Sequence, residues 1–185
     1  MIPPASMSVR LLSSKNQLTP AFGDGEQELL RKGSRYEIAF DMGEMDYVDA
    51  LDWSDLMSEG QTVVMAVYQP GLVTGAPGAP RVNGAGQSGM ALVIDGLTNG
   101  YTVRKGQFLS VVTQGRRFLY RAKASVTAPA GSATVQLHTM LRFPPADNDV
   151  VELEQPMIEG FPREVSDLTI VDNHNVEVSF TVRER

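Results

Sequence analysis

Four acidic residues lie close together in the sequence and could supply an acid–base pair: Asp147, Asp149, Glu152 and Glu154. Two carboxyl groups held in one cleft can act as general acid and general base. These acids belong to or follow the segment Pro144-Pro145-Ala146-Asp147, whose composition predicts a turn. Carboxylates in such a turn face solvent. We therefore interpret all four as ordinary loop residues and expect no catalysis from them.

The segment Gly84-Ala85-Gly86-Gln87-Ser88-Gly89 partly matches two functional motifs. A serine hydrolase carries Gly-x-Ser-x-Gly at a strand-to-helix turn, and the glycines around Ser88 lack that spacing. The dinucleotide fingerprint Gly-x-Gly-x-x-Gly matches in letters, but it must follow a strand and open a helix. Here a Gly/Pro-rich stretch precedes the motif and a strand is expected after it. The segment therefore predicts neither a nucleophilic serine nor a cofactor site.

Histidines and a cluster of acids are the remaining candidate metal ligands. His138 is expected on a strand and His174 in a turn, and nothing near either completes a ligand set. The segment 44–59 has no basic residue and carries these acids: Glu44, Asp46, Asp49, Asp52, Asp55 and Glu59. They indicate a cation site, an acidic docking face or a solvated helix side. We favour the last, because carboxylate metal sites use shaped loops or convergent helices. No catalytic, cofactor-binding or metal-binding residue is predicted.

The charge of the chain argues against nucleic-acid binding. The net charge is −6, and the basic pairs Arg104-Lys105 and Arg116-Arg117 each stand beside a glycine in an expected turn. Aromatic residues of the same region could form a stacking platform for bases, but in so acidic a chain we interpret them as core. These aromatic residues are Phe108, Phe118, Tyr120 and Phe143.

The absence of cysteine excludes disulfides, thiol nucleophiles and Cys-ligated zinc. The N-terminal segment Met1-Ile2-Pro3-Pro4-Ala5-Ser6 lacks the basic and apolar parts of a signal peptide. No apolar run approaches the ~20 residues that span a bilayer. We expect a soluble protein, made inside a cell, with no membrane insertion.

Alternation of apolar and polar residues predicts a mainly β fold. A strand at 35–42 and a strand at 176–182 would each bury every second residue. The residues concerned are Tyr36, Ile38, Phe40, Met42, Val176, Val178, Phe180 and Val182. The last strand should form a hairpin with 168–171 and pair with the N-terminal strands, because a strand needs neighbours. The polar segment 13–25 predicts turns.

The composition also predicts two domains. Residues 1–70 and 160–185 should form a β-sandwich-like domain with one helix at about 44–58. The segment 71–89, with six glycines and two prolines, predicts a linker or an exposed extended loop. Residues 90–159 should form an inserted small β-barrel of the oligonucleotide-binding-like or SH3-like kind. Its strands are predicted at 90–94, 107–113, 116–125, 133–138 and 150–154.

Several short motifs occur in an order that resembles a family of tailed-bacteriophage structural proteins, of the distal-tail or baseplate (tail-tip) type. The family pattern has a Gly-x-Gly-Gln-Ser/Thr-Gly motif, an Asp-Gly pair after a strand, a Lys-Ala-Gly-Asp-Phe-like turn, a Leu-Arg-x-x-Pro-Ala-Asp segment and a final strand with phenylalanine. The matching residues are Gly84–Gly89, Asp95-Gly96, Arg104–Phe108, Leu141–Asp147 and Val178–Phe180.

The resemblance implies a structural virion protein, not an enzyme, that forms a homo-oligomeric ring, most simply a hexamer. Such a ring joins the tail tube to the tail-tip hub and the adsorption apparatus. The protein would be assembled in the host bacterial cytoplasm and would reside in the phage tail. Its acidic helix would face basic residues of adjoining subunits, such as Arg116, Arg117 or Arg142. The alternative is a carbohydrate- or host-receptor-binding β-module of the tail tip, and a cell-wall hydrolase comes third.

Overall fold

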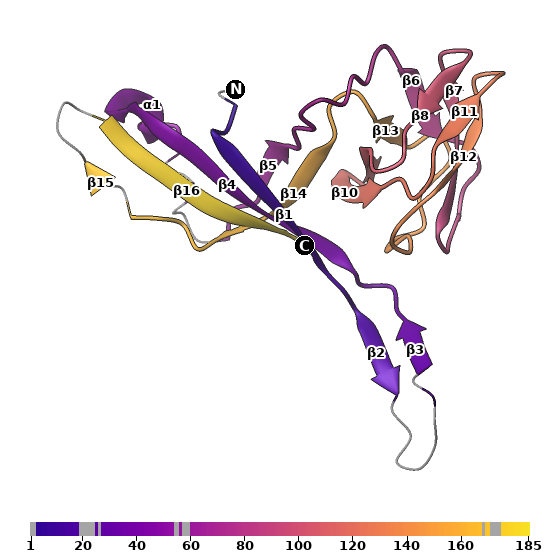
Figure 1. The fold of residues 1–185 in the computed structure, drawn as a ribbon, viewed down its shortest axis with the longest axis horizontal. Helices are drawn as coiled ribbons and strands as arrows, with labels where there is room; N and C mark the ends of the chain where they lie inside the picture. Colours follow the sequence, from indigo (N-terminus) through magenta and orange to yellow (C-terminus); the bar gives the residue numbers. More distant parts are fainter. Residues whose placement is uncertain are drawn as a thin grey trace. The chain divides into compact units, whose positions relative to one another are not determined.

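The computed structural model describes residues 3–18, 25, 27–53, 56, 60–167, 169–170 and 175–185 (Figure 1). Strands account for 53% of the structure and helix for 4%, which confirms the predicted mainly β fold. The chain divides into two compact units. Unit 1 comprises Met1–Leu11, Tyr36–Met65 and Ile158–Arg185, and unit 2 comprises Leu12–Arg35 and Ala66–Met157.

Unit 1 is built on a sheet with the strand order β1-β4-β16-β14-β5, and β15 pairs with β16. These strands are β1 (Ser6–Leu12), β4 (Arg35–Asp46), β5 (Val63–Ala66), β14 (Met157–Arg163), β15 (Thr169–Ile170) and β16 (Asn175–Glu184). The strands β4 and β16 run antiparallel, with Phe40 opposite Phe180. The predicted pairing of the last strand with an N-terminal strand and the predicted hairpin at 168–182 are therefore confirmed.

The core of unit 1 follows the predicted alternation. The inward residues of β4 and β16 are all buried: Tyr36, Ile38, Phe40, Met42, Val176, Val178, Phe180 and Val182. The ring of Phe180 lies 5.6 Å from that of Phe40 and 5.7 Å from that of Trp53. Successive side chains of a strand point to opposite faces, so this one pattern fixes which face of each strand meets the core.

The predicted helix at 44–58 is wrong over its first part. Strand β4 continues to Asp46, and helix α1 covers only Tyr47–Leu51. Met45 is buried opposite Val176, and a register shift in the pairing of β4 with β16, between Glu177 and Ser179, moves the buried positions of β4 by one residue. Cross-strand pairing over this stretch outweighs a local helical tendency, which is a weak preference. Residues 54–55 and 57–59, including Asp55 and Glu59, lie outside the described chain.

The barrel-like part belongs to unit 2. A sheet with the order β10-β9-β13-β6-β7-β12 curls on itself, and β8 pairs with β11. The strands are β6 (Gly78–Val82), β7 (Ala91–Leu97), β8 (Tyr101–Val103), β9 (Phe108–Thr113), β10 (Arg116–Arg121), β11 (Val126–Ala128), β12 (Ala133–Gln136) and β13 (Val150–Glu152). Just beyond the edge strands β10 and β12, Ala122 and Leu137 form a bridge, and Lys123 N donates to Gln136 O at 2.7 Å. All five predicted barrel strands are present.

The segment 71–89, predicted as a linker, contains a strand of this sheet. Strand β6 lies between β13 and β7, and Val82 is fully buried. Gly96 of β7 has φ +71°, and a Cβ there would lie 2.3 Å from the carbonyl oxygen of Ala79. Glycine at Gly78 and Gly96 thus permits the backbones of β6 and β7 to approach closely. A strand of this kind and a linker have similar compositions, so composition alone does not distinguish them.

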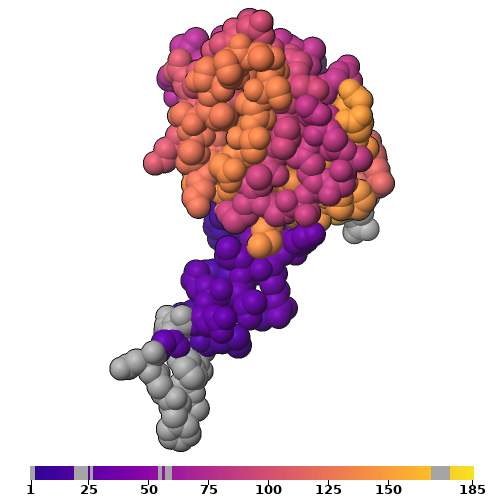
Figure 2. Space-filling view, turned by 90° about the vertical axis from the view of Figure 1, so that its right-hand side faces the viewer, coloured from indigo at the N-terminus to yellow at the C-terminus, as the bar shows by residue number. Residues whose placement is uncertain are grey.

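Further strands were not predicted: β8 and β11 of unit 2, β14 of the unit 1 sheet, and two strands between residues 15 and 30. Strands β2 (Lys15–Leu18) and β3 (Gln27–Leu30) form a separate two-stranded sheet (Figure 1). Atoms of this part of the chain have the violet colours of the N-terminal region in the space-filling view of Figure 2. Lys15 lies opposite Leu30, and Leu18 lies opposite Gln27. Their sequences, Lys-Asn-Gln-Leu and Gln-Glu-Leu-Leu, contain neither β-branched residues nor aromatic ones. The polar segment 13–25, read as turns, therefore carries the first strand of a hairpin.

Candidate functional site

Gln87 ties the glycine-rich motif to the sheet of unit 2. Its side-chain nitrogen Nε2 donates to the carbonyl oxygens of Asn83 (2.8 Å), Gly84 (3.1 Å) and Val93 (3.0 Å). Its oxygen Oε1 accepts a hydrogen bond from the backbone N–H of Val93 at 2.7 Å. The amide therefore occupies the place that a neighbouring strand would take beside Val93. Ser88 is exposed next to it, and the motif works as a structural support.

The second motif segment meets the first one in space. The backbone N–H of Gly84 donates to Asp147 Oδ1 at 2.8 Å, and that of Gly86 donates to the carbonyl oxygen of Pro145 at 2.8 Å. Asp149 Oδ2 accepts from the backbone N–H of Ala146 at 2.7 Å. Both aspartates thus bind main-chain donors, which confirms their interpretation as turn residues. The segments 83–89 and 141–149 form one hydrogen-bonded group of loops, which we call the motif cluster.

The two glutamates after this turn do not join the aspartates in a shared cleft. Glu152 accepts hydrogen bonds from Arg117 Nε at 3.1 Å and from Ser110 Oγ at 2.5 Å. Glu154 is exposed. Glu152 is thus paired with a cation and a hydroxyl group, whereas the two aspartates bind main-chain N–H groups. The four acids therefore do not form an acid–base pair. Within the described chain, no cluster of three or more His, Asp or Glu side chains could hold a metal ion.

His138, the histidine that lies among the described residues, gives no metal site. His138 has a pKa below its ordinary value, because partial desolvation of its side chain disfavours the charged form and nearby Arg121, Lys123 and Lys105 add positive charge. His138 is therefore neutral at pH 7 and stands among cations, which would repel a metal ion. His174 lies outside the described residues.

Most of the barrel aromatics are core residues, as predicted. Phe108, Phe118 and Tyr120 are buried, whereas Phe143 is exposed and stacks on Phe118 with a ring-centroid distance of 6.1 Å. The guanidinium groups of two of the predicted partners of the acidic helix lie over the ring of Phe118, that of Arg116 at 5.4 Å and that of Arg142 at 5.1 Å. The third, Arg117, pairs with Glu152. All three arginines thus contact groups of their own unit.

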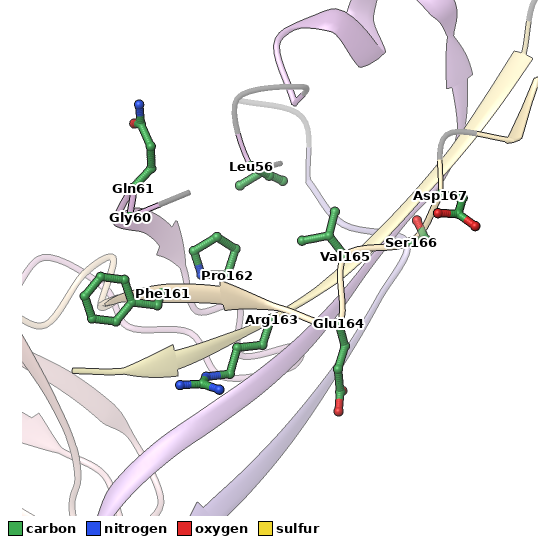
Figure 3. Close-up of a pocket in the computed structure, with 10 residues that line it drawn as sticks. All are labelled: Leu56, Gly60, Gln61, Phe161, Pro162, Arg163, Glu164, Val165, Ser166 and Asp167. Carbon is green, nitrogen blue, oxygen red and sulfur yellow. The ribbon is translucent and has the colours of Figure 1, made fainter. Parts of the chain in front are cut away.

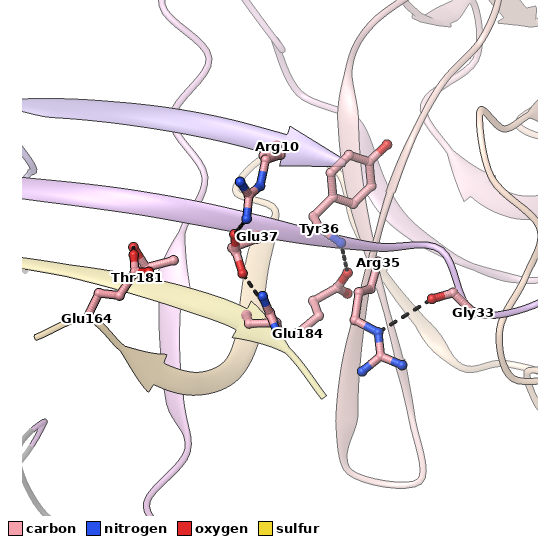
Figure 4. Close-up of polar contacts among 9 residues, drawn as sticks. Arg10, Gly33, Arg35, Tyr36, Glu37, Glu164, Thr181 and Glu184 are labelled. Atoms are coloured by element: carbon pink, nitrogen blue, oxygen red, sulfur yellow. Dashed lines mark hydrogen bonds and ion pairs between the residues drawn. The ribbon is translucent and has the colours of Figure 1, made fainter. Parts of the chain in front are cut away.

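Unit 1 contains an ion cluster around the buried Glu37 that no pattern in the sequence indicated (Figure 4). Glu37 of β4 receives hydrogen bonds from Arg10 of β1 and from Arg183 Nε of β16, the latter at 2.6 Å. Glu37 was assigned to the outer, solvated face of its strand, yet its side chain is only 9% exposed because the neighbouring strands place an arginine on each side of it. Burial by itself raises the pKa of Glu37, but the hydrogen bonds and charges of Arg183 and Arg10 outweigh it and lower the pKa.

The lowered pKa of Glu37 predicts a loss of stability in acid. A carboxyl group whose pKa is lower in the folded state stabilises the fold fully above its unfolded value, near 4.5, and this stabilisation disappears as the pH falls through the folded value. We expect the melting temperature of the wild type to drop more steeply below this value than that of Glu37→Gln, which cannot titrate. Glu44→Gln, an exposed change on the same strand, should keep the wild-type slope. Equal slopes for wild type and Glu37→Gln would contradict the assignment.

A pocket of about 450 Å³ lies in unit 1 beside β14 and the residues that follow it (Figure 3). Leu56, Pro162 and Val165 face the hollow, whereas the charged ends of Arg163 and Glu164 point away from it. The carboxylate of Glu164 accepts a hydrogen bond from Thr181 Oγ1 at 3.3 Å. Polar residues, among them Gln61, Ser166 and Asp167, also line it, so the pocket is of mixed character.

Two of the sequence motifs thus form the motif cluster, which supports the sheet of unit 2. Unit 1 contains a separate ion cluster around Glu37, which the sequence did not reveal. In the described part of the chain, none of the helices is long and apolar enough to cross a membrane. No protein-family model matches the sequence, and no curated protein matches it.

Proposed function

We propose that this protein is a structural component of a tailed-bacteriophage tail, a ring-forming distal tail protein that joins the tail tube to the tail-tip hub and the adsorption apparatus. The observation that carries the proposal is the motif cluster. The segments that resemble the phage family, 84–89 and 141–149, bind each other through Gly84 and Asp147 and support the sheet through Gln87. Residues that maintain shape in this way fit an assembly role.

The hairpin β2–β3 gives independent support. All eight residues of its two strands are exposed, and its leucines therefore lie at the surface of the unit. A chain that contacts copies of itself through two different patches forms a closed ring when the rotation between copies permits it. The proposal is therefore a homo-oligomeric ring, most simply a hexamer, stacked between the tail tube and hub or baseplate proteins, with no enzymatic activity.

The proposal predicts that purified virions contain this protein in several copies at the distal end of the tail. Electron microscopy of isolated tails should place an antibody label at one end, and mass measurement of the purified protein should give a single oligomer, with six copies as the expected number. The gene should lie directly after the one for the tape-measure protein. A strictly monomeric protein that is absent from virions would refute the proposal.

The alternative function, a carbohydrate- or host-receptor-binding module of the tail tip, is favoured by one feature. Phe161 is exposed and lines the pocket of unit 1. Aromatic side chains in a hollow are suited to flat apolar ligand surfaces. Binding of the purified protein to host cells, inhibited by a soluble cell-wall polysaccharide, would support this alternative, whereas tail localisation without cell binding would support the ring.

A further inference from the structure

The hairpin β2–β3, which we call the arm, presents apolar side chains that remain about half exposed in the described chain. Leu18, Leu29 and Leu30 are 49%, 44% and 53% exposed. A two-stranded hairpin is marginally stable in water unless a hydrophobic face packs against something else. The arm therefore has the properties of a segment that is stabilised by a partner.

Two positive charges adjoin the leucines of the arm. Arg31 and Lys32 directly follow β3 and are exposed. The other charges of the two strands, Lys15 and Glu28, form an ion pair of 2.6 Å with each other and so contribute little net charge. The arm thus combines an apolar patch with a basic end, and a matching partner would combine an apolar patch with acids.

Helix α1 and its flanking residues provide such a surface, which we call the α1 surface. Its apolar side chains, Tyr47, Val48 and Leu51, are 41%, 74% and 45% exposed. Its acids, all exposed, are Glu44, Asp46, Asp49 and Asp52. No basic residue occurs between positions 44 and 53. Two α1 surfaces would repel each other, because juxtaposed like charges are costly, so this surface favours a basic partner over a copy of itself.

We propose that the arm of one copy docks on the α1 surface of a second copy of this chain. The leucines of the arm would cover Val48 and Leu51, and Arg31 and Lys32 would face the acids. Because the whole chain carries a charge of −6, association of two copies needs a local match of opposite charges, and the arm supplies one. The contact joins two different patches and is therefore of the type that closes rings. This inference rests on the proposed ring function and adds the surfaces that form it.

A charge-reversal experiment tests the docking. The arm variant carries Arg31→Glu and Lys32→Glu, and the α1 variant carries Asp49→Lys and Asp52→Lys. Each variant alone should lose the oligomer in analytical ultracentrifugation, because like charges then meet at the contact. An equimolar mixture should recover the oligomer, since the reversed arm of one variant faces the reversed α1 surface of the other while the two unchanged surfaces also meet.

A matched control reverses two exposed lysines of unit 2, Lys105→Glu and Lys123→Glu, and should assemble like the wild type. Circular dichroism and thermal unfolding verify that every variant is folded. The docking is refuted if both variants assemble normally, if mixing does not restore the oligomer, or if the wild type stays monomeric at low salt. Normal assembly of both variants, with the protein present at the tail end, would refute this contact alone. Absence of the protein from virions would refute the proposed function.

Discussion

Replacing Gly96 with alanine is expected to destabilise unit 2 by about 3 kcal/mol or more, the largest effect of any single methyl group in the barrel. Gly96 has φ +71°, which costs an alanine about 1 kcal/mol or slightly more. The added Cβ would also lie 2.3 Å from the carbonyl oxygen of Ala79, so the pairing of β6 with β7 would have to open. Forced overpacking of this kind typically costs another 1–3 kcal/mol, by order of magnitude about 2 kcal/mol.

Gly100 provides the matched control. Its φ of +79° carries a similar backbone strain, but a Cβ there would have no atom within 4 Å. Gly100→Ala should therefore show only the conformational cost, and the difference between the two variants in urea unfolding measures the steric effect. Equal loss of stability in both variants would mean that β6 and β7 are not in close contact at Gly96, and that the barrel lacks β6 as a central strand.

Sequence periodicity predicts the parts of this fold in which one face of a strand is buried and the other is not. The alternation in β4 and β16 identifies Phe40 and Phe180 as inward residues, and both are buried against each other. The barrel strands β9 and β10 differ, because successive residues of each are buried on both faces, and their apolar composition rather than an alternation marks them as strands. In these elements the local pattern and the tertiary packing agree, so the sequence suffices.

The predictions fail where tertiary contacts override local composition. Local composition indicates a helix from about residue 44, but pairing with β16 extends β4 to Asp46. Glycines and prolines at 71–89 indicate a linker, but a strand with close backbone contacts needs the same residues. Glu37 stands at an outward position of its strand and is buried by arginines from two other strands, Arg10 and Arg183, which no local pattern can reveal.

In the motif cluster, too, the sequence indicates some features and only the tertiary contacts determine the others. The segments 84–89 and 141–149 lie together in the structure, which the sequence did not predict. Their roles could not be read from their letters, because the same Gly-x-Gly spacing occurs in phosphate-binding loops. What decides the role is the orientation of the Gln87 side chain, which points its amide at the backbone of Val93. That orientation depends on β7 and thus on a contact that only the fold supplies.

Replacing Gln87 with glutamate should be the most informative test of the motif cluster. In the wild type, the carbonyl oxygens of Asn83, Gly84 and Val93 accept hydrogen bonds from the amide of Gln87. A glutamate at this position keeps the shape of the amide but brings a negative charge close to these oxygens. We expect a loss of about 3 kcal/mol at pH 7, from the lost bonds at about 1 kcal/mol each together with the repulsion. The surrounding oxygens should raise the pKa of the new carboxyl group in the folded state, so the variant should regain part of its stability relative to wild type as the pH falls.

The same change at an exposed position, Gln136→Glu, should have little effect at any pH. Gln87→Ala should be destabilised at all pH values, since it loses the bonds without adding a titrating group. Urea unfolding of the variants at pH 7 and pH 5 separates these cases. If Gln87→Glu were as stable as the wild type at pH 7, the amide would not be the link between the motif and the sheet. The resemblance of residues 84–89 to a structural motif would then lose its physical basis, and the motif cluster could no longer support the assembly proposal.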